Sequence, residues 1–338
     1  MSAYTSAVLR RVLVGLLAVV SALSLAVAGR IAWVGYGPPP GASVTAAQVE
    51  FLQRSIAAGD GARMQRLFPE GDFFLRALTA TAAARTPSAD VARVRALRDS
   101  SDAPEQVAVF GSGMVPEHGI FQAGWALAAA VELARASGDS ADREDVRRRA
   151  GVIEEALRGS RSGFLESYPD QYWPCDTVVA ASALADTAVL LDQAEWLATV
   201  RAWRANALRS ADAAIGLLPH RVDEEGRSLE VPRGSSQSVI QAFWPTIGRT
   251  LDGRPDIESW SAFRREFLVR QVGLVGVREY PRGTSTRGDV DSGSAAARRQ
   301  RERQHGGPGG CPLGRRHLAD TGPESAGRAA WTAHHVGR

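Results

Sequence analysis

The chain has 338 residues, enough for one large domain or two ordinary ones, and its 44% hydrophobic content is typical of globular proteins. A formal net charge of only +3 gives no support to a nucleic-acid-binding function, and all forty basic residues are arginines, as a GC-rich gene would encode. Cys175 and Cys311 are the only cysteines, so the chain has neither a disulfide framework nor a zinc-ligand spacing.

The N-terminal segment is the most hydrophobic part of the chain. Arg10 and Arg11 precede Val12–Ala28, which contains seventeen residues without a charge. Paired arginines before an apolar run favour a cytoplasmic N-terminus, and the run lies at the short end of the membrane-spanning range of roughly 17–25 residues. We therefore predict a single-pass membrane anchor in residues 1–35, with the rest of the chain extracytoplasmic. Ala26–Ala28 also fits a signal-peptide cleavage site, so a secreted protein is the alternative.

Helical periodicity begins after a proline-rich stretch. Residues 36–43 contain three consecutive prolines and predict a stiff linker. Beyond it, hydrophobic residues recur at helical spacing, and Ser88 is expected to cap one of the helices. The predicted helices are Val44–Ala58, Phe73–Ala84, Ser88–Arg98, Gly119–Arg135, Arg143–Leu157, Pro174–Leu191 and Gln193–Ala214. A short β-hairpin that turns near Glu225–Gly226 is expected between Leu217 and Arg233.

The predicted helices alternate in character. Those that begin at Gly119 and Pro174 are apolar on nearly all sides, which indicates burial, whereas those at Arg143 and Gln193 carry one apolar stripe and should cover the outside. Junctions between a polar loop and a buried helix recur at 54-, 60- and 55-residue separations, near Gln122, Asp176, Ser236 and Asp291. We predict an all-α fold in which helical hairpins form an α/α toroid over residues 44–293. An irregular all-helical domain is the alternative.

The composition changes abruptly after the last junction. Residues 294–338 contain no Ile, Phe, Tyr or Met, and only two leucines and one valine. Such a segment cannot bury enough apolar surface to offset the entropy of ordering, so we predict a disordered basic tail. Because earlier junctions lead into buried helices, we hypothesise a shift of reading frame near Ser294 that removes the helices needed to close the ring. A genuine basic tail is the alternative.

The motif Tyr168–Asp176, read YPDQYWPCD, combines three aromatic residues, two carboxylates and a cysteine just before a buried helix. Pro174 suits the first helical position, which puts Cys175 and Asp176 in the first turn. The helix N-terminus favours negative charge, so we predict a low-pKa thiol at Cys175 and an ionised, basic Asp176. In the alternative, Asp176 caps the helix and Cys175 is an inert buried thiol.

The aromatic residues of this motif predict a binding wall. Tyr168, Tyr172 and Trp173 could line a substrate site, with Asp170 as a further binding residue. The other interpretation places these aromatic side chains in the hydrophobic core.

Other junctions carry polar residues in comparable positions. Glu117 and His118 precede the buried helix at Gly119, so they could meet the motif at one end of the toroid. Before the next buried helix, Ser235 is expected to act as a cap. Arg233, with the free amides of that helix, could hold an anion.

The remaining candidates lie on the predicted hairpin and near the tail. His220 and Asp223 could form a proton-transfer pair or be exposed strand residues. The last polar groups before the tail, where paired acids would suit general acid–base catalysis or glycoside hydrolysis, are Glu279, Tyr280, Asp289 and Asp291. No stretch matches a P-loop, a dinucleotide fingerprint or a nucleophile elbow.

The run Trp173–Asp176 and its alanine-rich helix resemble linalool dehydratase/isomerase-like domains within the α/α-toroid superfamily, which also includes six-hairpin glycosidases. The resemblance covers roughly residues 44–293. It implies a cofactor-independent dehydratase or isomerase that uses acid–base residues, including cysteines, on an alcohol. Cys175 matches one such cysteine; the second is missing, and Glu166 is the nearby residue that could take its place.

Three functions follow as expectations, each with a small-molecule or glycan substrate, the membrane as a partner through the N-terminal helix, and neither a cofactor nor a nucleic acid. The first is a dehydratase/isomerase with Cys175 and Asp176 as proton carriers and Tyr168 and Tyr172 as positioning groups. The second is a glycosidase with acids drawn from the junctions: Asp176, Glu117, Asp289 or Asp291. The third is a non-catalytic envelope binding protein.

Overall fold

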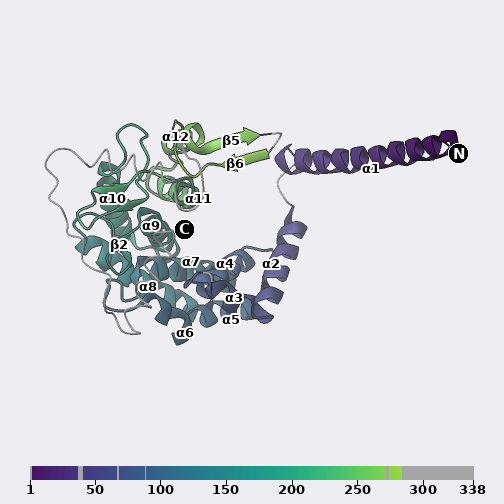
Figure 1. Ribbon diagram of the computed structural model, residues 1–338. Coiled ribbons are helices and arrows are strands. Elements are labelled where there is room, and N and C mark those ends of the chain that lie inside the picture. The colour runs from purple at the N-terminus through teal and green to yellow at the C-terminus, as the bar shows by residue number, and fades with distance from the viewer. Residues whose placement is uncertain (1, 37–40, 67, 88, 272–273, 284–338) are drawn as a thin grey trace, which may run out of the picture.

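A computed structural model describes residues 2–36, 41–66, 68–87, 89–271 and 274–283, which form a mostly helical protein (Figure 1). The helices are α1 (Ser2–Tyr36), α2 (Ala42–Ala57), α3 (Asp60–Gln65), α4 (Gly71–Ala84), α5 (Val91–Ser101), α6 (Pro104–Val107), the 3-10 helix η1 (Ala108–Phe110), α7 (Gly119–Ser137), α8 (Ser140–Gly159), α9 (Pro174–Leu191), α10 (Ala194–Arg209), α11 (Gly234–Asp252) and α12 (Ile257–Phe267). The strands are β1 (Glu166–Tyr168), β2 (Gln171–Tyr172), β3 (Arg221–Val222), β4 (Ser228–Glu230), β5 (Leu268–Gln271) and β6 (Leu274–Val277).

Helix α1 extends away from the body of the protein (Figure 1). Its stretch Arg10–Arg30 has 21 residues with a mean hydropathy of 2.5, and none of it is buried by the rest of the chain. Helix α9 also has the length and composition of a spanning helix, but 83% of it is buried, so it is a core helix. The chain therefore has one N-terminal helix long and apolar enough to cross a membrane, a property that a signal sequence shares.

Several predicted boundaries are wrong. The linker is shorter than residues 36–43, because α1 includes Tyr36 and α2 already begins at Ala42. The cap of α5 is Asp90, whose side chain accepts from the Arg93 amide, and Ser88 lies outside the described residues. Helix α10 ends at Arg209, before the predicted Ala214, because the amide of Ala214 bonds to the Asp212 side chain in a turn.

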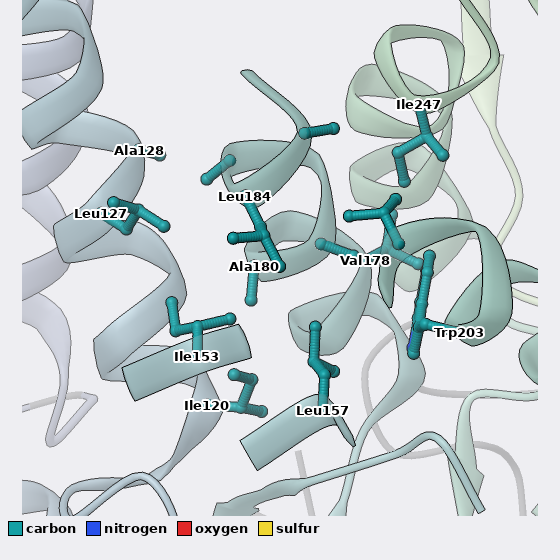
Figure 2. Packing of buried hydrophobic residues seen from close by; sticks show 14 of the residues in the cluster. Ile120, Leu127, Ala128, Ile153, Leu157, Val178, Ala180, Leu184, Trp203 and Ile247 are labelled. Carbon is teal, nitrogen blue, oxygen red and sulfur yellow. The ribbon is translucent and has the colours of Figure 1, made fainter. Parts of the chain in front are cut away.

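The core lies around α9, and the predicted alternation of inner and outer helices is confirmed. Leu127 of α7, Leu184 of α9 and Ile247 of α11 are completely buried, and Figure 2 shows them together with Trp203 of the outer helix α10. Small residues allow α7 and α9 to approach closely: a Cβ on Gly124 would lie 3.0 Å from the Cβ of Ala180. Each large apolar side chain that is buried here stabilises the fold by about 1.5–3 kcal/mol.

The inner helices form a row in chain order. Helix α4 packs on α7, α7 on α9, and α9 on α11, while α5, α8, α10 and α12 each pack on the inner helix that precedes them. This arrangement is compatible with an all-helical toroid. The loop segments that precede the inner helices lie next to one another, and this brings the N-terminal ends of those helices together.

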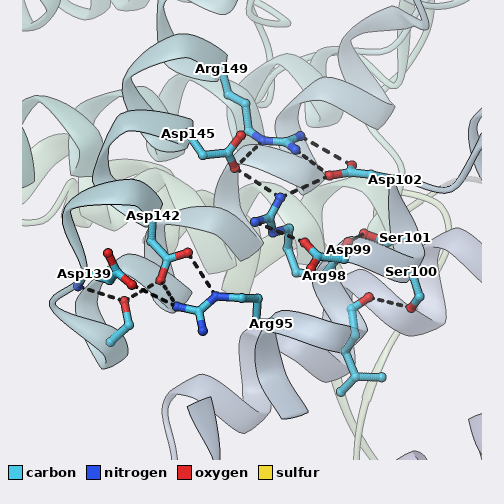
Figure 3. Close-up of polar contacts among 12 residues, drawn as sticks. Arg95, Arg98, Asp99, Ser100, Ser101, Asp102, Asp139, Asp142, Asp145 and Arg149 are labelled. Atoms are coloured by element: carbon cyan, nitrogen blue, oxygen red, sulfur yellow. Dashed lines mark hydrogen bonds and ion pairs between the residues drawn. The ribbon is translucent and has the colours of Figure 1, made fainter. Parts of the chain in front are cut away.

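An ion network joins two of the outer helices, α5 and α8 (Figure 3). Arg149 of α8 bonds to Asp145 at 2.8 Å and to Asp102, which follows α5. Arg98 of α5 reaches Asp145 at 3.2 Å, and Arg95 reaches Asp142 at 2.6 Å. The apolar contacts of α5 and α8 face inward, so this network holds the two helices together on their outer sides.

In the part of the chain that the structure describes, two small antiparallel sheets accompany the helices, one more than the sequence predicts. The predicted hairpin exists as β3 and β4, but it belongs to a four-stranded sheet with the order β1-β2-β3-β4. Tyr172 of β2 pairs with Val222 of β3, which joins the motif Tyr168–Asp176 to the hairpin. Strands β5 and β6, which the helical periodicity of the sequence does not reveal, form the second sheet.

Candidate functional site

The motif Tyr168–Asp176 forms the turn between β1 and β2 and then the start of α9. Asp170 adopts a left-handed backbone at φ 60°, a conformation that Asp tolerates better than most residues. Trp173 is the N-cap residue and Pro174 opens the helix, as predicted, because the missing amide hydrogen of proline costs nothing in the first turn. Cys175 and Asp176 therefore lie in that turn, with their side chains buried.

Asp176 is a buried carboxyl group with a strongly raised pKa. Only 4% of the residue is exposed, and burial raises its pKa to about 7, although Ser167 and Cys175 partly stabilise the charged form. The nearby charge of Glu70 raises the pKa further. Near neutral pH both forms of Asp176 are therefore populated, rather than the ionised form alone. A helix N-terminus contributes about 0.3–1 kcal/mol at an exposed site, which cannot offset a shift of about three pKa units at about 1.4 kcal/mol each.

The two carboxylate oxygens of Asp176 have different surroundings. Oδ1 accepts a hydrogen bond from the Cys175 thiol at 3.5 Å. Oδ2 is buried and has no hydrogen-bond partner of ordinary geometry within the described residues. Buried polar atoms are normally paired, so an unpartnered carboxyl oxygen marks a position where another molecule could bond.

Cys175 does not have the predicted low-pKa thiol. Burial, together with the charge of Asp176, raises the pKa of Cys175 well above its ordinary value. The thiol is therefore neutral at physiological pH and acts as a hydrogen-bond donor to Asp176. Desolvation outweighs the helix dipole here for the same reason as at Asp176.

The predicted aromatic wall is only partly exposed. Tyr168 is 1% exposed and packs between the rings of Phe110, Phe121 and Trp173, and burial raises its pKa well above the ordinary value. Its ring belongs to the core, and the charges of Glu70 and Asp176 raise its pKa further, so the role of Tyr168 beside the site stays a prediction. Tyr172 and Trp173 are half-buried, and burial raises the pKa of Tyr172 to about 12.

The junctions before α7 and α9 lie together, as predicted. Gly119 opens α7 at φ 80°, and a Cβ there would lie 2.5 Å from the carbonyl oxygen of Ser167 on β1. The side chains in front of α7 nevertheless bond to their own loop: His118 Nδ1 lies 2.6 Å from the Gly111 carbonyl oxygen, and Glu117 accepts from the Gly113 amide at 3.2 Å. Neither side chain has a contact with Asp176 among the described hydrogen bonds.

The hairpin residues also have partners other than those predicted. Asp223 bonds to Arg227 at 2.7 Å, a partner that the sequence did not suggest. His220 Nδ1 lies 2.6 Å from the hydroxyl of Ser236 in the first turn of α11, and its ring stacks on Trp173 at 5.9 Å. His220 thus connects the start of α11 with the start of α9.

The sequence predicts that an anion binds at the start of α11. In the structure the carboxylate of Glu279, from the same chain, occupies that position. This carboxylate accepts from the Ser235 amide at 3.0 Å and from the Ser235 hydroxyl at 2.9 Å. Arg233, not Ser235, is the N-cap residue; it pairs with Glu230 at 2.8 Å and lies 5.5 Å from the centre of the Tyr280 ring. These groups form a structural contact at the start of α11, and the expectation that they bind substrate stays a prediction.

Two residues near Asp176 are missing from the sequence prediction. Ser167 stands one position before the motif, and Glu70 is the N-cap residue of α4, in the same position relative to its helix as His118. The recurrence of polar residues at helix starts was the signal that could have revealed Glu70. Glu166, the residue considered in place of a second cysteine, accepts from the Asp170 amide at 2.8 Å. Asp289 and Asp291 lie outside the described residues.

Within the described residues, no group of three or more His, Cys, Asp or Glu side chains could hold a metal ion. No protein-family model matches this sequence, and no match was found among curated proteins. The function is therefore argued from the site itself.

Proposed function

We propose that this protein is an acid–base enzyme of the dehydratase/isomerase class in which Asp176 carries the proton. The observation that carries the proposal is a carboxyl group that is 4% exposed, has a pKa of about 7, and has one oxygen, Oδ2, that no hydrogen bond of ordinary geometry reaches among the described residues. A general acid or base works best when its pKa lies near the working pH, and burial is the usual way to raise a carboxyl pKa that far.

One residue of this kind can complete a dehydration. The protonated Asp176 donates its proton to the hydroxyl group of an alcohol, the carbon–oxygen bond breaks, and water leaves. The Asp176 carboxylate then removes a proton from the adjacent carbon, which gives an alkene and restores the protonated acid. If the released water instead adds to another carbon of the allylic cation and the Asp176 carboxylate takes the proton that this water loses, the product is an isomeric alcohol and the acid is again restored. Both outcomes balance without a cofactor.

The neighbours of Asp176 have distinct roles in this proposal. The Cys175 thiol, which is neutral, donates to Oδ1 and leaves Oδ2 to face the substrate. Ser167 stabilises the carboxylate that forms after proton transfer, whereas the charge of Glu70 favours the protonated starting form. These opposite influences support a carboxyl group that can alternate between its two forms near neutral pH.

The proposed setting is an α/α toroid that a membrane anchor holds on the extracytoplasmic side. The ordered contacts of the inner helices α4, α7, α9 and α11 support the toroid. The apolar stretch Arg10–Arg30 supports the anchor, with secretion as the alternative. Because Asp176 is buried, we expect the substrate to reach it through movement of the β1–β2 hairpin, and a small alcohol suits that route better than a polymer.

The proposal is tested with the full chain and a panel of allylic and tertiary alcohols, with alkene formation measured by gas chromatography. We expect Asp176→Asn to lower turnover about 10²–10⁴-fold, the usual contribution of a general acid or base. The matched control is Asp192→Asn at the other end of α9, where Asn tolerates the left-handed backbone at φ 54°. Turnover should also fall as the pH rises above about 7, because the acid must begin protonated. Unchanged turnover in Asp176→Asn would contradict the proposal.

Glycoside hydrolysis is the second candidate, favoured by one observation. The carboxyl groups of Glu70 and Asp176 lie close enough that the charge of Glu70 adds to the effect of burial in raising the pKa of Asp176. Glycosidases use such a pair with one member protonated. Release of aryl alcohol from chromogenic glycosides, lost in both Glu70→Gln and Asp176→Asn, would support this function over dehydration. Saturable glycan binding without turnover of either substrate class would support a binding protein.

A further inference from the structure

A second cavity lies away from Asp176. It has a volume of about 770 Å³, is open to solvent on one side, and is lined by residues of α2, α4, α7, α9 and α11. Its lining does not include Cys175 or Asp176, and it extends to Arg85 at the end of α4 and Arg249 in the last turn of α11. Its volume falls in the range of roughly 300–1,000 Å³ that is usual for small-molecule sites.

The wall of this cavity is largely apolar. Phe74 and Trp125 are in edge-to-face contact at 4.9 Å, and Trp125 meets Phe243 in the same way at 5.2 Å. Leu78 of α4 also lines the cavity, and 37% of it is exposed. An exposed leucine beside a continuous aromatic surface is unfavourable in water and offers a place for an apolar chain.

The charged residues that line the polar end of the cavity are Arg85, Arg249, Glu132 and Asp186, and Arg135, which lies outside the lining, pairs with both carboxylates. Glu132 bonds to Arg85 at 2.8 Å and to Arg135 at 3.0 Å, and Arg135 also bonds to Asp186 at 2.9 Å. These two arginines and two carboxylates neutralise one another. Arg249 is the additional cation.

Arg249 has a neutral neighbour only. It donates to the hydroxyl of Thr246 at 3.1 Å, and no carboxylate lies within ion-pair distance of it among the described residues. The hydroxyl of Thr246 lines the same cavity and can add a hydrogen bond to a bound anion. Arg249 and Thr246 together thus offer a charge-assisted site for a head group.

We propose that this cavity binds an amphiphile with a long apolar chain and an anionic head group, with the chain on the aromatic wall and the head group at Arg249. Burial of the chain would provide most of the affinity, and the arginine would set the orientation. A lipid environment provides molecules of this chemistry, and α1 is long and apolar enough to hold the protein there. The proposal does not depend on the role of Asp176.

Photocrosslinking of the full chain in phosphatidylcholine vesicles tests the proposal. Diazirine probes are added in separate arms: a long-chain fatty acid, the matching fatty alcohol, and phosphatidylglycerol. Mass spectrometry then locates the labelled peptides. We expect labelling of α4 and α11 by the fatty acid or by phosphatidylglycerol, and these two arms distinguish a free carboxylate from a lipid head group.

Substitutions at exposed positions test whether the probes label the cavity or other parts of the protein surface. Ala242→Trp should fill the cavity and reduce labelling of α4 at least tenfold, whereas Ala205→Trp on the exposed side of α10 should leave it unchanged. Arg249→Gln should lower labelling by the anionic probes about tenfold and leave the fatty alcohol unaffected, with Arg201→Gln as the matched control. Labelling confined to α1, or equal labelling in Ala242→Trp and wild type, would overturn the proposal.

Discussion

Buried aspartates in two regions of this protein have opposite properties. At the start of α9, burial raises the pKa of Asp176 to about 7, and no arginine or other cation pairs with it among the described contacts. Between α5 and α8, burial also acts to raise the pKa values of Asp142 and Asp145, but arginine partners lower both below the ordinary value. The ion network therefore favours the folded state at neutral pH, and the Asp176 site opposes it. A destabilising group that is kept in a folded protein points to function.

The largest expected effect distinguishes these regions through pH. The folded-state pKa of Asp176, about 7, exceeds the unfolded value near 3.9, so its burial costs nothing below pH 4 and its cost grows until about pH 7. Above pH 7 the cost reaches about 4 kcal/mol. Asp176→Asn should therefore unfold at higher urea concentration than wild type at pH 8, with the difference shrinking toward pH 4. If the difference in urea midpoint between Asp176→Asn and wild type does not depend on pH, the Asp176 charge does not oppose folding, and the contrast between the two regions is lost.

Loss of one arginine should weaken the ion network by a smaller amount. Arg149 is 15% exposed and bonds to Asp145 and Asp102, so Arg149→Ala removes one cation partner from each of two partly buried carboxylates. We expect about 2 kcal/mol of lost stability, below the 3–5 kcal/mol of a fully buried pair. The control is Arg147→Ala, which breaks an exposed pair with Glu144 and should cost less than about 0.5 kcal/mol. Equal effects in urea unfolding would show that the network is only a surface feature.

Acid should weaken the ion network, whereas it removes the cost of burying Asp176. Because the folded pKa of Asp145 is lowered, its contribution is present above the unfolded value near 3.9 and is lost as the pH falls below it. Asp145→Asn should reduce the loss of stability between pH 5 and pH 2.5 by about 1 kcal/mol, a value that allows for solvent screening. Thermal unfolding across this range measures it. A steeper acid dependence in the variant would contradict the assigned sign.

The smallest effect concerns reactivity and leaves stability unchanged. The pKa of Cys175 is raised, so iodoacetamide should alkylate it at pH 8 far more slowly in the folded protein than in urea, by at least about 100-fold. Mass spectrometry separates its peptide from that of Cys311. Fast alkylation with a midpoint below pH 7 would instead mean that the helix N-terminus outweighs burial, which would also call the raised pKa of Asp176 into question.

Local patterns predicted the helical framework well. The start of α9 at Pro174 and the burial of α7 and α9 follow from proline geometry and from side chains that are apolar on all helix faces. The approach of the α7 and α9 junctions also followed, because equally spaced helical pairs bring equivalent ends together. Strands β5 and β6 were not predicted from the sequence, because four-residue strands carry too little periodic signal.

The sequence by itself therefore determined most of the long helices, which of them are buried, and where the Tyr168–Asp176 motif lies, because these properties depend on neighbours a few positions away; α3 and α12 were not predicted. Only the tertiary structure decided the chemistry of those residues. The carboxylate of Glu279, which is 44 residues further along the chain, accepts the hydrogen bonds of Ser235 at the predicted anion site. Desolvation by several packed segments raises the pKa of Asp176. Burial and ion pairing depend on contacts between distant segments, and no local pattern reports their balance.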